Sequence, residues 1–455
     1  MSSTTRKGAG ATKLSATDRR IFARLMPILI AAYIISFLDR TNIGMAKDRL
    51  EIDLGITAAA YGLGAGLFFV AYALMEIPSN LIMHKVGARI WITRIMITWG
   101  IISGGMAFVQ NDVQFYIMRI LLGAAEAGLF PGVLLYLTYW FGRDVRTRAM
   151  AYFLVGACAA SVLGGPLGGL LLQMDGIGGY HGWQWMFVVE ALPAVLLAFV
   201  VWKVLPDRPS DAKWLTAAEA AEIETRLAKE QADGTAHSGT HSFGAIFKDR
   251  AIMLVIYIYL AHQIAVYSVT YFLPSVIAAN GVASPVLIGL LAGIPWFFGA
   301  VGAIFISPLA SNPVRSRKLL TGGLILMISG LAIGALGGSV VGLIGFGLSG
   351  LAWFVVQPIL FNVTGTRLSG ITLAAGLALM NTIGITGGFF GPSVMGATEQ
   401  ATGNPLSGLW FAVGLLVLGL LSVPLINLKN SGDVAREATA AAEAETAAKR
   451  AELSK

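Results

Sequence analysis

The chain has 455 residues, of which 56% are hydrophobic and 13% are charged, and its mean hydropathy is +0.73. Soluble globular domains carry about 25% charged residues, so this composition excludes a water-soluble protein. The formal net charge is +7. The basic residues gather mainly in alternate loops between apolar segments, as the positive-inside rule predicts for a membrane protein, so we expect no nucleic-acid partner.

Twelve apolar segments recur along the chain. An apolar helix of about 20 residues crosses a hydrocarbon core about 30 Å thick, and strand-like alternation with period two is absent, which argues against a barrel. The sequence therefore predicts an all-α polytopic membrane protein with twelve transmembrane helices, at residues 24–46, 59–83, 92–111, 113–141, 148–173, 183–205, 251–279, 284–311, 317–337, 339–366, 371–398 and 405–427.

A polar segment, residues 206–250, separates the first six segments from the last six. We expect a tail (1–23), a six-helix bundle (24–205), this connector, a second six-helix bundle (251–427) and a second tail (428–455). Such paired halves are typical of transporters with a substrate site at their interface. The basic N-terminal tail predicts cytoplasmic termini. In the connector, Thr216 and Glu219 form a predicted capping box for a helix over 215–229. His237 and His241 are only two potential metal ligands in a polar stretch, so we expect them to be solvated and not to bind a metal.

Five ionisable residues lie within predicted spans: Asp39, Arg40, Glu76, Arg119 and Glu126. Each costs several kcal/mol in a bilayer unless it faces a cavity or a partner, so each is a candidate functional residue. The alternative is a permanent internal cluster of salt bridges, or a position near the headgroups. Two more such residues, Glu190 and Lys203, lie nearer the ends of the sixth segment and are left aside.

Helix geometry assigns these groups different partners. Neighbours on a helix point about 100° apart, so Asp39 and Arg40 cannot aim at one spot. We expect Asp39 to face the fourth helix and Arg40 to face the substrate. Arg119, Gly123 and Glu126 share one face of the fourth helix, where the glycine leaves room for another helix or a ligand. A carboxylate in a desolvated cavity can bind or release a proton as its surroundings change. An arginine without a fixed partner is a natural receptor for a carboxylate.

The second half offers neutral groups instead of buried charges. They are candidates for contacting the uncharged part of a substrate: His262, Gln263, Tyr267, Tyr271, Gln357, Phe361 and Asn381. For each residue taken singly, the alternative is anchoring at the membrane interface or a hydrogen bond between helices. Glycine and proline at 163–169 and 384–392 predict close packing and a local break in the fifth and eleventh helices.

Six ordered motifs resemble the anion:cation symporter family of the major facilitator superfamily: SFLDRTNIGMA, EIPSNLIMHKVGARIWI, RILLGAAEAGLFPG, YWFGRDVRTRA, GWQWMFVVEALP and LPDRPSDAKWL. The resemblance implies uptake of small organic anions with protons across a bacterial inner membrane by alternating access. It also implies that Asp39 and Glu126 bind protons, Arg40 binds the substrate carboxylate, Arg119 couples the two, and Asn381 contacts the substrate.

Departures from the sugar-acid carriers of that family lie at three positions. Phe37 replaces a tyrosine, Ala157 a glutamine and Phe361 a tryptophan, which leaves fewer groups to hydrogen-bond a polyhydroxylated sugar acid. The sequences SFLDR, LYLTYWF, GWQWMF and SGLWFAVGLLVLG resemble the 4-hydroxyphenylacetate permease and tartrate carrier branches more closely. The gating motif between the second and third helices has Asn80 and His84 where a glycine and an aspartate are usual.

We therefore expect a monomeric proton-coupled importer of a small organic carboxylate, with the lipid bilayer and protons as its other partners and no cofactor or metal. Its expected site residues are Asp39, Glu126, Arg119, Arg40, Phe37, Asn381, Phe361, Gln263, Tyr267, Gln357 and Glu76. The alternatives are a proton-driven drug exporter of the same superfamily and a sensor without flux. No nucleophile with an adjacent base suggests an enzyme.

Overall fold

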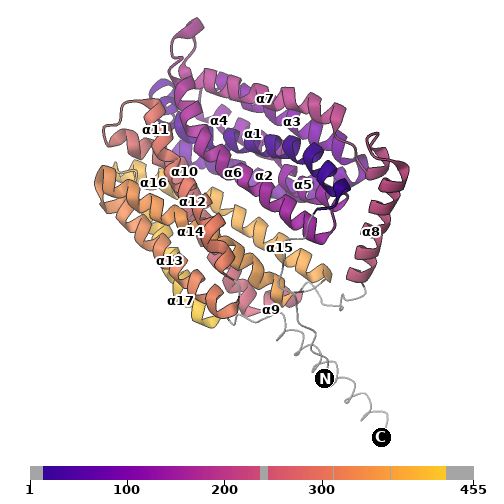
Figure 1. The fold of residues 1–455 in the computed structure, drawn as a ribbon. Coiled ribbons are helices and arrows are strands. Elements are labelled where there is room, and N and C mark those ends of the chain that lie inside the picture. Colours follow the sequence, from indigo (N-terminus) through magenta and orange to yellow (C-terminus); the bar gives the residue numbers. More distant parts are fainter. Residues whose placement is uncertain (1–13, 236–243, 311, 369, 427–455) are drawn as a thin grey trace. The chain divides into compact units, whose positions relative to one another are not determined.

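The computed structural model describes residues 14–235, 244–310, 312–368 and 370–426, and these residues contain helices and no strand (Figure 1). They form two compact units. The first comprises residues 14–56, 67–235 and 284–289, and the second comprises 57–66, 244–283 and the described residues from 290 to 426. The predictions for both tails, and those for His237 and His241, lie outside the described residues.

Eight helices account for most of the first unit, and α1 is the longest of them. The second helix also contributes its first residues to the second unit. In chain order the helices are α1 (Ala16–Leu54), α2 (Ala58–Val86), α3 (Ala88–Gly105), α4 (Asp112–Glu126), α5 (Leu129–Thr138), α6 (Arg143–Leu172), α7 (Gly182–Val204) and α8 (Ala217–Thr235). Short 3-10 turns lie at Met106–Phe108, Ile177–Gly179 and Pro209–Asp211. The helix α1 packs against α6 and α7, and α3 packs against α7 and α4.

The second unit is also helical, with α10, α13 and α14 as its long elements. Its helices are α9 (Gly244–Lys248), α10 (Arg250–Ala279), α11 (Pro285–Ala292), α12 (Ile294–Val301), α13 (Pro313–Leu336), α14 (Gly338–Arg367), α15 (Gly370–Ile385), α16 (Gly387–Thr402) and α17 (Leu409–Ser422). The first part of α11 belongs to the first unit. A π turn at Gly302–Ile306 and 3-10 turns at Ser307–Leu309 and Val423–Leu425 complete the unit.

Ten helical segments in the described part of the chain are long and apolar enough to cross a membrane. They correspond to the first ten expected spans, so the polytopic helical class is confirmed. The eleventh expected span is two shorter helices, α15 and α16, and the twelfth is the apolar stretch Leu409–Leu425. The total of twelve crossings and the cytoplasmic position of the ends stay predictions.

The prediction of a break in the fifth expected helix is wrong, whereas the prediction of a break in the eleventh is confirmed. The helix α6 continues through Pro166, as transmembrane helices can when neighbouring helices support them. Its glycines do allow close packing, because a Cβ on Gly164 would lie 2.8 Å from Leu38 Cδ2. The eleventh expected helix divides at Thr386, and there a Cβ on Gly387 would lie 2.7 Å from the Ile264 nitrogen.

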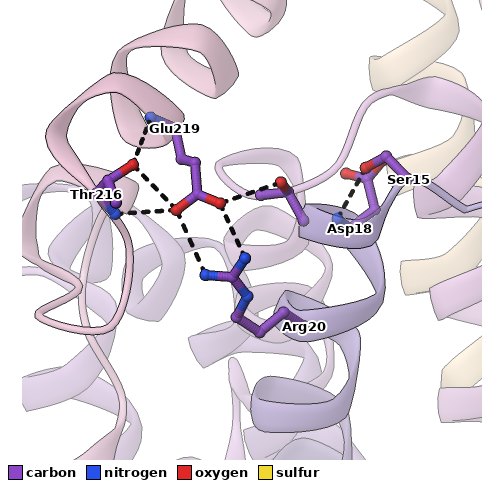
Figure 2. A network of polar contacts seen from close by, with 6 residues as sticks. Ser15, Asp18, Arg20, Thr216 and Glu219 are labelled. Carbon is purple, nitrogen blue, oxygen red and sulfur yellow. Dashed lines mark hydrogen bonds and ion pairs between the residues drawn. The ribbon is translucent and has the colours of Figure 1, made fainter.

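The connector helix α8 is fastened to the beginning of α1. Its predicted capping box is confirmed, since the Glu219 backbone N–H donates to Thr216 Oγ1 at 3.2 Å and the Thr216 N–H donates to Glu219 Oε2 at 3.0 Å. The same carboxylate binds Arg20 of α1 at 2.9 Å (Figure 2). A second ion pair joins Arg226 to Asp18 at 3.0 Å. The first part of the connector is therefore an integral part of the first unit.

Candidate functional site

The Asp39 carboxylate is buried among polar groups of α3. Trp99 Nε1 donates to Asp39 Oδ2 at 2.6 Å, and Ser103 Oγ donates to Oδ1 at 2.9 Å. All three residues are at most 1% exposed. Both oxygens of the carboxylate are therefore hydrogen-bonded inside the first unit.

The neighbouring Arg40 points to a different helix. Arg40 Nε donates to Glu126 Oε1 at 2.7 Å, and Ser36 Oγ, one turn earlier on α1, donates to the same oxygen at 2.5 Å. The guanidinium carbon lies 4.8 Å from the ring centre of Tyr72 and 5.2 Å from that of Phe37. This is a buried ion pair surrounded by aromatic rings, which favour a cation over their faces.

The different partners expected for Asp39 and Arg40 are thus confirmed, but the assignment of the partners is wrong. We expected Asp39 to face the fourth span and Arg40 to have no fixed partner. Instead Arg40 faces Glu126 at the end of α4, and Asp39 faces α3. The 100° between successive residues requires two directions, and only the packing of the helices decides which residue takes which direction.

Glu126 is the last residue of α4, at a break that the sequence analysis did not predict. We expected one helix over 113–141, but α5 begins only at Leu129. Pro131 has no N–H to offer the Ala127 carbonyl, which would be its partner in a continuous helix. Gly128 takes φ +94°, a conformation that favours glycine. Such breaks in transmembrane helices are typical of ligand and ion sites in transporters.

The carbonyl released by this break has a partner on α2. Ser79 Oγ donates to the Ala127 oxygen at 2.7 Å, and Trp91 Nε1 of α3 donates to Ser79 Oγ at 2.9 Å. A Cβ on Gly128 would lie 2.1 Å from Ser79 Oγ. The serine therefore fixes the chain directly after Glu126, and its proximity excludes any side chain at Gly128.

The face shared by Arg119, Gly123 and Glu126 packs against α2. Arg119 is 1% exposed, and its guanidinium carbon lies 4.8 Å from the ring centre of Phe68. A Cβ on Gly123 would lie 2.1 Å from the Phe68 carbonyl oxygen. The room left by this glycine is therefore occupied by another helix. Glu76 of α2 is also buried, at 8% exposure.

In the second unit, a cluster of aromatic and amide groups forms around Tyr259 of α10. Gln357 Nε2 donates to the Tyr259 hydroxyl at 3.2 Å, and the Phe361 ring meets the Tyr259 ring edge-on, with their centres 5.2 Å apart. The predicted substrate residues Gln357 and Phe361 therefore share one place. The sequence analysis missed Tyr259, although it lies one turn before Gln263 on α10.

His262 joins Gln263 to the same region. Its Nε2 lies 3.0 Å from the Trp353 carbonyl oxygen, and its Nδ1 lies 3.0 Å from Gln263 Oε1. A carbonyl only accepts, so Nε2 carries the proton, and in a neutral ring Nδ1 is then an acceptor. The Gln263 side chain donates to Nδ1 when its amide oxygen and nitrogen are exchanged, so that its NH2 group faces the ring. Tyr267 stacks on Tyr271 instead. Asn381 lies on α15, partly exposed.

The site residues outside the sequence analysis are mainly small polar or indole groups: Ser36, Ser79, Trp99 and Ser103. Only Ser36 had a usable signal, because it precedes Arg40 by four residues and so shares its helix face. The others depend on contacts between helices. No group of three His, Cys, Asp or Glu side chains suited to a metal occurs in the part of the chain that the structure describes.

Comparison with known proteins places the chain in a family. A sequence model of the Major Facilitator Superfamily matches residues 29–392. A protein of Agrobacterium vitis named putative tartrate transporter is 41% identical over 423 residues, covering 92% of this chain and 96% of the relative. A quinolone resistance transporter of Acinetobacter baumannii is 37% identical over 420 residues, covering 90% and 95%.

Among solved structures, the fold is similar to a bacterial homologue of the human lysosomal transporter Spinster, in an inward-facing and occupied conformation. The TM-score is 0.72 at 16% identity, over 90% of this chain and 97% of that one. At this identity the likeness shows the fold alone, while the family model and the relatives span most of the sequence. The chain belongs to the Major Facilitator Superfamily, and it is a membrane transporter rather than an enzyme.

Proposed function

We propose that this transporter is a monomeric symporter that imports a small organic carboxylate together with protons, by alternating access of two six-helix bundles. The observation that carries the proposal is the buried Arg40–Glu126 pair, with 2.7 Å between Arg40 Nε and Glu126 Oε1 at the break between α4 and α5. The pair contains both groups that such a transporter needs, a receptor for a carboxylate and a carboxyl that can bind a proton.

The coupling follows from competition for the guanidinium of Arg40. The Glu126 carboxylate holds Arg40 through Nε, and protonation of Glu126 removes its charge. A substrate carboxylate then takes its place on the guanidinium, whose planar fork suits a two-point contact. Removing one partner of a buried ion pair costs about 3–5 kcal/mol, so the states with a proton alone or an anion alone are disfavoured by about a hundredfold or more. Proton and anion therefore bind together.

The substrate class follows from what surrounds Arg40. Phe37 and Tyr72 offer ring faces beside the guanidinium, and a relative that is 41% identical is named as a tartrate transporter. A hydroxy-diacid or an aromatic acid fits this environment better than a sugar acid, which needs more hydrogen-bonding groups. The neutral groups Gln263, Gln357, Phe361 and Asn381 of the second unit would contact the uncharged part of the substrate. The distribution of basic residues favours cytoplasmic termini, and the bacterial source of the relatives favours an inner membrane.

The direct test of proton coupling is Glu126→Gln in proteoliposomes. Uptake of radiolabelled tartrate, 4-hydroxyphenylacetate and galactonate is measured with an acid exterior. We expect the wild type to accumulate at least one acid, and the variant to lose accumulation because it cannot exchange a proton at this position. Glu219→Gln, which removes the same charge on α8, is the matched control. Accumulation by Glu126→Gln equal to the wild type would disprove the role of Glu126.

A second experiment tests the anion receptor. Arg40→Lys keeps the charge and loses the planar fork. Because a hydrogen bond to a charged group contributes about 1.5–3 kcal/mol, we expect a loss of substrate affinity of about tenfold to a hundredfold in counterflow, which needs no proton gradient. Unchanged affinity would show that Arg40 does not hold the carboxylate at two points.

An exporter of lipophilic drugs is the second candidate function, since a relative that is 37% identical is named as a quinolone resistance transporter. It needs an acidic residue but no receptor for an anion. Efflux of a fluoroquinolone from loaded proteoliposomes, measured beside tartrate counterflow, separates the two functions. Drug efflux that persists in Arg40→Lys, without counterflow of any acid, would favour export.

A further inference from the structure

Glu190 of α7 is a buried carboxyl that the Arg40–Glu126 pair does not involve. It is 4% exposed, and both of its carboxylate oxygens are buried without a hydrogen bond among the described residues. The same holds for the side-chain oxygen and nitrogen of Asn42 on α1, which is 3% exposed. A buried charge without hydrogen bonds costs several kcal/mol. This position therefore disfavours a permanently ionised carboxylate.

The neighbours of Glu190 connect it to Asp39. A Cβ on Gly168 of α6 would lie 3.7 Å from Glu190 Oε1, so the carboxyl lies where α7 meets α6. The Asn42 amide and the Asp39 carboxylate of α1 are the polar and the charged group that act on Glu190. Asn42 follows Asp39 by three residues and shares its helix face.

Besides Arg40, the next residue on α1, two charged residues of α4 lie around this pair. Glu126 and Arg119 both act on Asp39, and they oppose each other in sign. On α3, Asp39 meets the neutral donors Trp99 and Ser103. Two carboxylates that act on each other in a buried place cannot both ionise without a large cost, so the pair binds a proton more readily than either carboxylate would alone.

We propose that Glu190 is a second proton-binding residue of this transporter, whose protonation beside the Asn42 amide is coupled to the charge of Asp39. The proton enters from the aqueous phase, is held by a carboxyl oxygen of Glu190 or of Asp39, and returns to the aqueous phase, so no other reactant is needed. An amide suits this place because its N–H group donates to an ionised carboxylate and its oxygen accepts from a protonated one. The inference rests on the proposed proton coupling but concerns a pair of residues separate from Arg40 and Glu126.

Infrared difference spectroscopy tests this inference without a substrate. Spectra of the full-length protein in liposomes are recorded over a pH series, and the C=O band of protonated carboxyl groups is compared between variants. We expect Glu190→Gln to lose part of the pH-dependent band of the wild type. Glu190→Asp keeps a carboxyl and should restore the band. Asn42→Leu should keep the band but move the pH at which it changes, because the shared amide is gone.

An identical pH-dependent carboxyl band in wild type and Glu190→Gln would overturn the inference. Size-exclusion chromatography checks that each variant is folded. If Glu190→Gln does not fold, a band that keeps its midpoint in Asn42→Leu would overturn the inference equally. These outcomes are independent of transport. Failure of proton-driven uptake in the wild type would refute the proposed function, whereas the infrared result would still show whether Glu190 binds a proton.

Discussion

Gly123→Ala tests whether the packing of α4 against α2 positions Glu126. A Cβ at this position would lie 2.1 Å from the Phe68 carbonyl oxygen and 3.1 Å from the Phe68 Cα, whereas ordinary contact begins at 3.4 Å. The atoms in the way are backbone, so the helices must separate by about 1.3 Å, and overpacking of this kind costs about 1–3 kcal/mol. The better helix propensity of alanine offsets about 1 kcal/mol of that cost.

The expected result is a small loss of stability with a large loss of transport. Glu126 lies three residues after Gly123, and a displacement of about 1 Å in a reacting group can cost about a hundredfold in rate. Proton-driven uptake in proteoliposomes and the thermal unfolding midpoint are measured for each variant. Gly104→Ala on α3 is the control, because its Cβ would meet only the Ala191 Cβ, at an ordinary 3.5 Å. Uptake by Gly123→Ala equal to that of Gly104→Ala would refute the reasoning.

Two further predictions concern fixed points of the first unit. Ser79→Ala leaves the Ala127 carbonyl without its donor at the break after α4, so we expect a loss of about 1–3 kcal/mol in the free energy of unfolding. Trp91→Phe keeps the bond from Ser79 to Ala127 and should therefore lose less stability. Equal losses in the two variants would contradict this prediction. The backbone N–H of Thr216, with its hydroxyl, holds the pKa of the Glu219 carboxyl below its ordinary value. The ionised carboxyl therefore stabilises α8 above the pKa that Glu219 has in the unfolded chain, and this stabilisation is lost as the pH falls below about 4. Amides in the first turn of α8 should then lose protection from hydrogen exchange in the wild type but show no such pH step in Glu219→Gln, and a step in both would be evidence against the carboxyl.

Hydrophobic segments of about 20 residues predicted ten of the described helices, because a bilayer allows few other solutions for a backbone that must satisfy its own hydrogen bonds. The capping box of α8 was predictable for a similar reason, since both of its residues are local in sequence. Breaks within helices were harder to predict. Both Pro166 and Pro131 have glycine neighbours, yet only the helix around Pro131 breaks, where Ser79 of another helix donates to the freed Ala127 carbonyl.

The candidate site shows the same limit. Burial of Asp39, Arg40 and Glu126 follows from their position in apolar segments, but the pairing of Arg40 with Glu126 depends on the rotation of α1 against α4. That rotation depends on how each helix packs against its other neighbours, as Gly123 of α4 does against Phe68 of α2. The sequence places Glu190 nearer the end of its apolar segment, so its burial is not predictable from that segment alone. In the structure it is 4% exposed, because α7 packs there against α1 and α6.

The charge of the buried groups favours entry of an anion with protons over exchange of an anion for protons. Apart from Asp18, which forms an ion pair with Arg226 of α8, four acids and three bases are buried among the described residues of the membrane-spanning helices in the first unit: Asp39, Glu76, Glu126 and Glu190 against Arg40, Lys47 and Arg119. If all were ionised, the set would carry a net charge of −1, and a bound carboxylate would make it more negative. Charge is costly in such surroundings, so binding of the anion is favoured only when at least one carboxyl is protonated. This set of groups therefore supports the proposed symport of an anion with a proton, and it offers two candidate places for that proton, one on each face of α1.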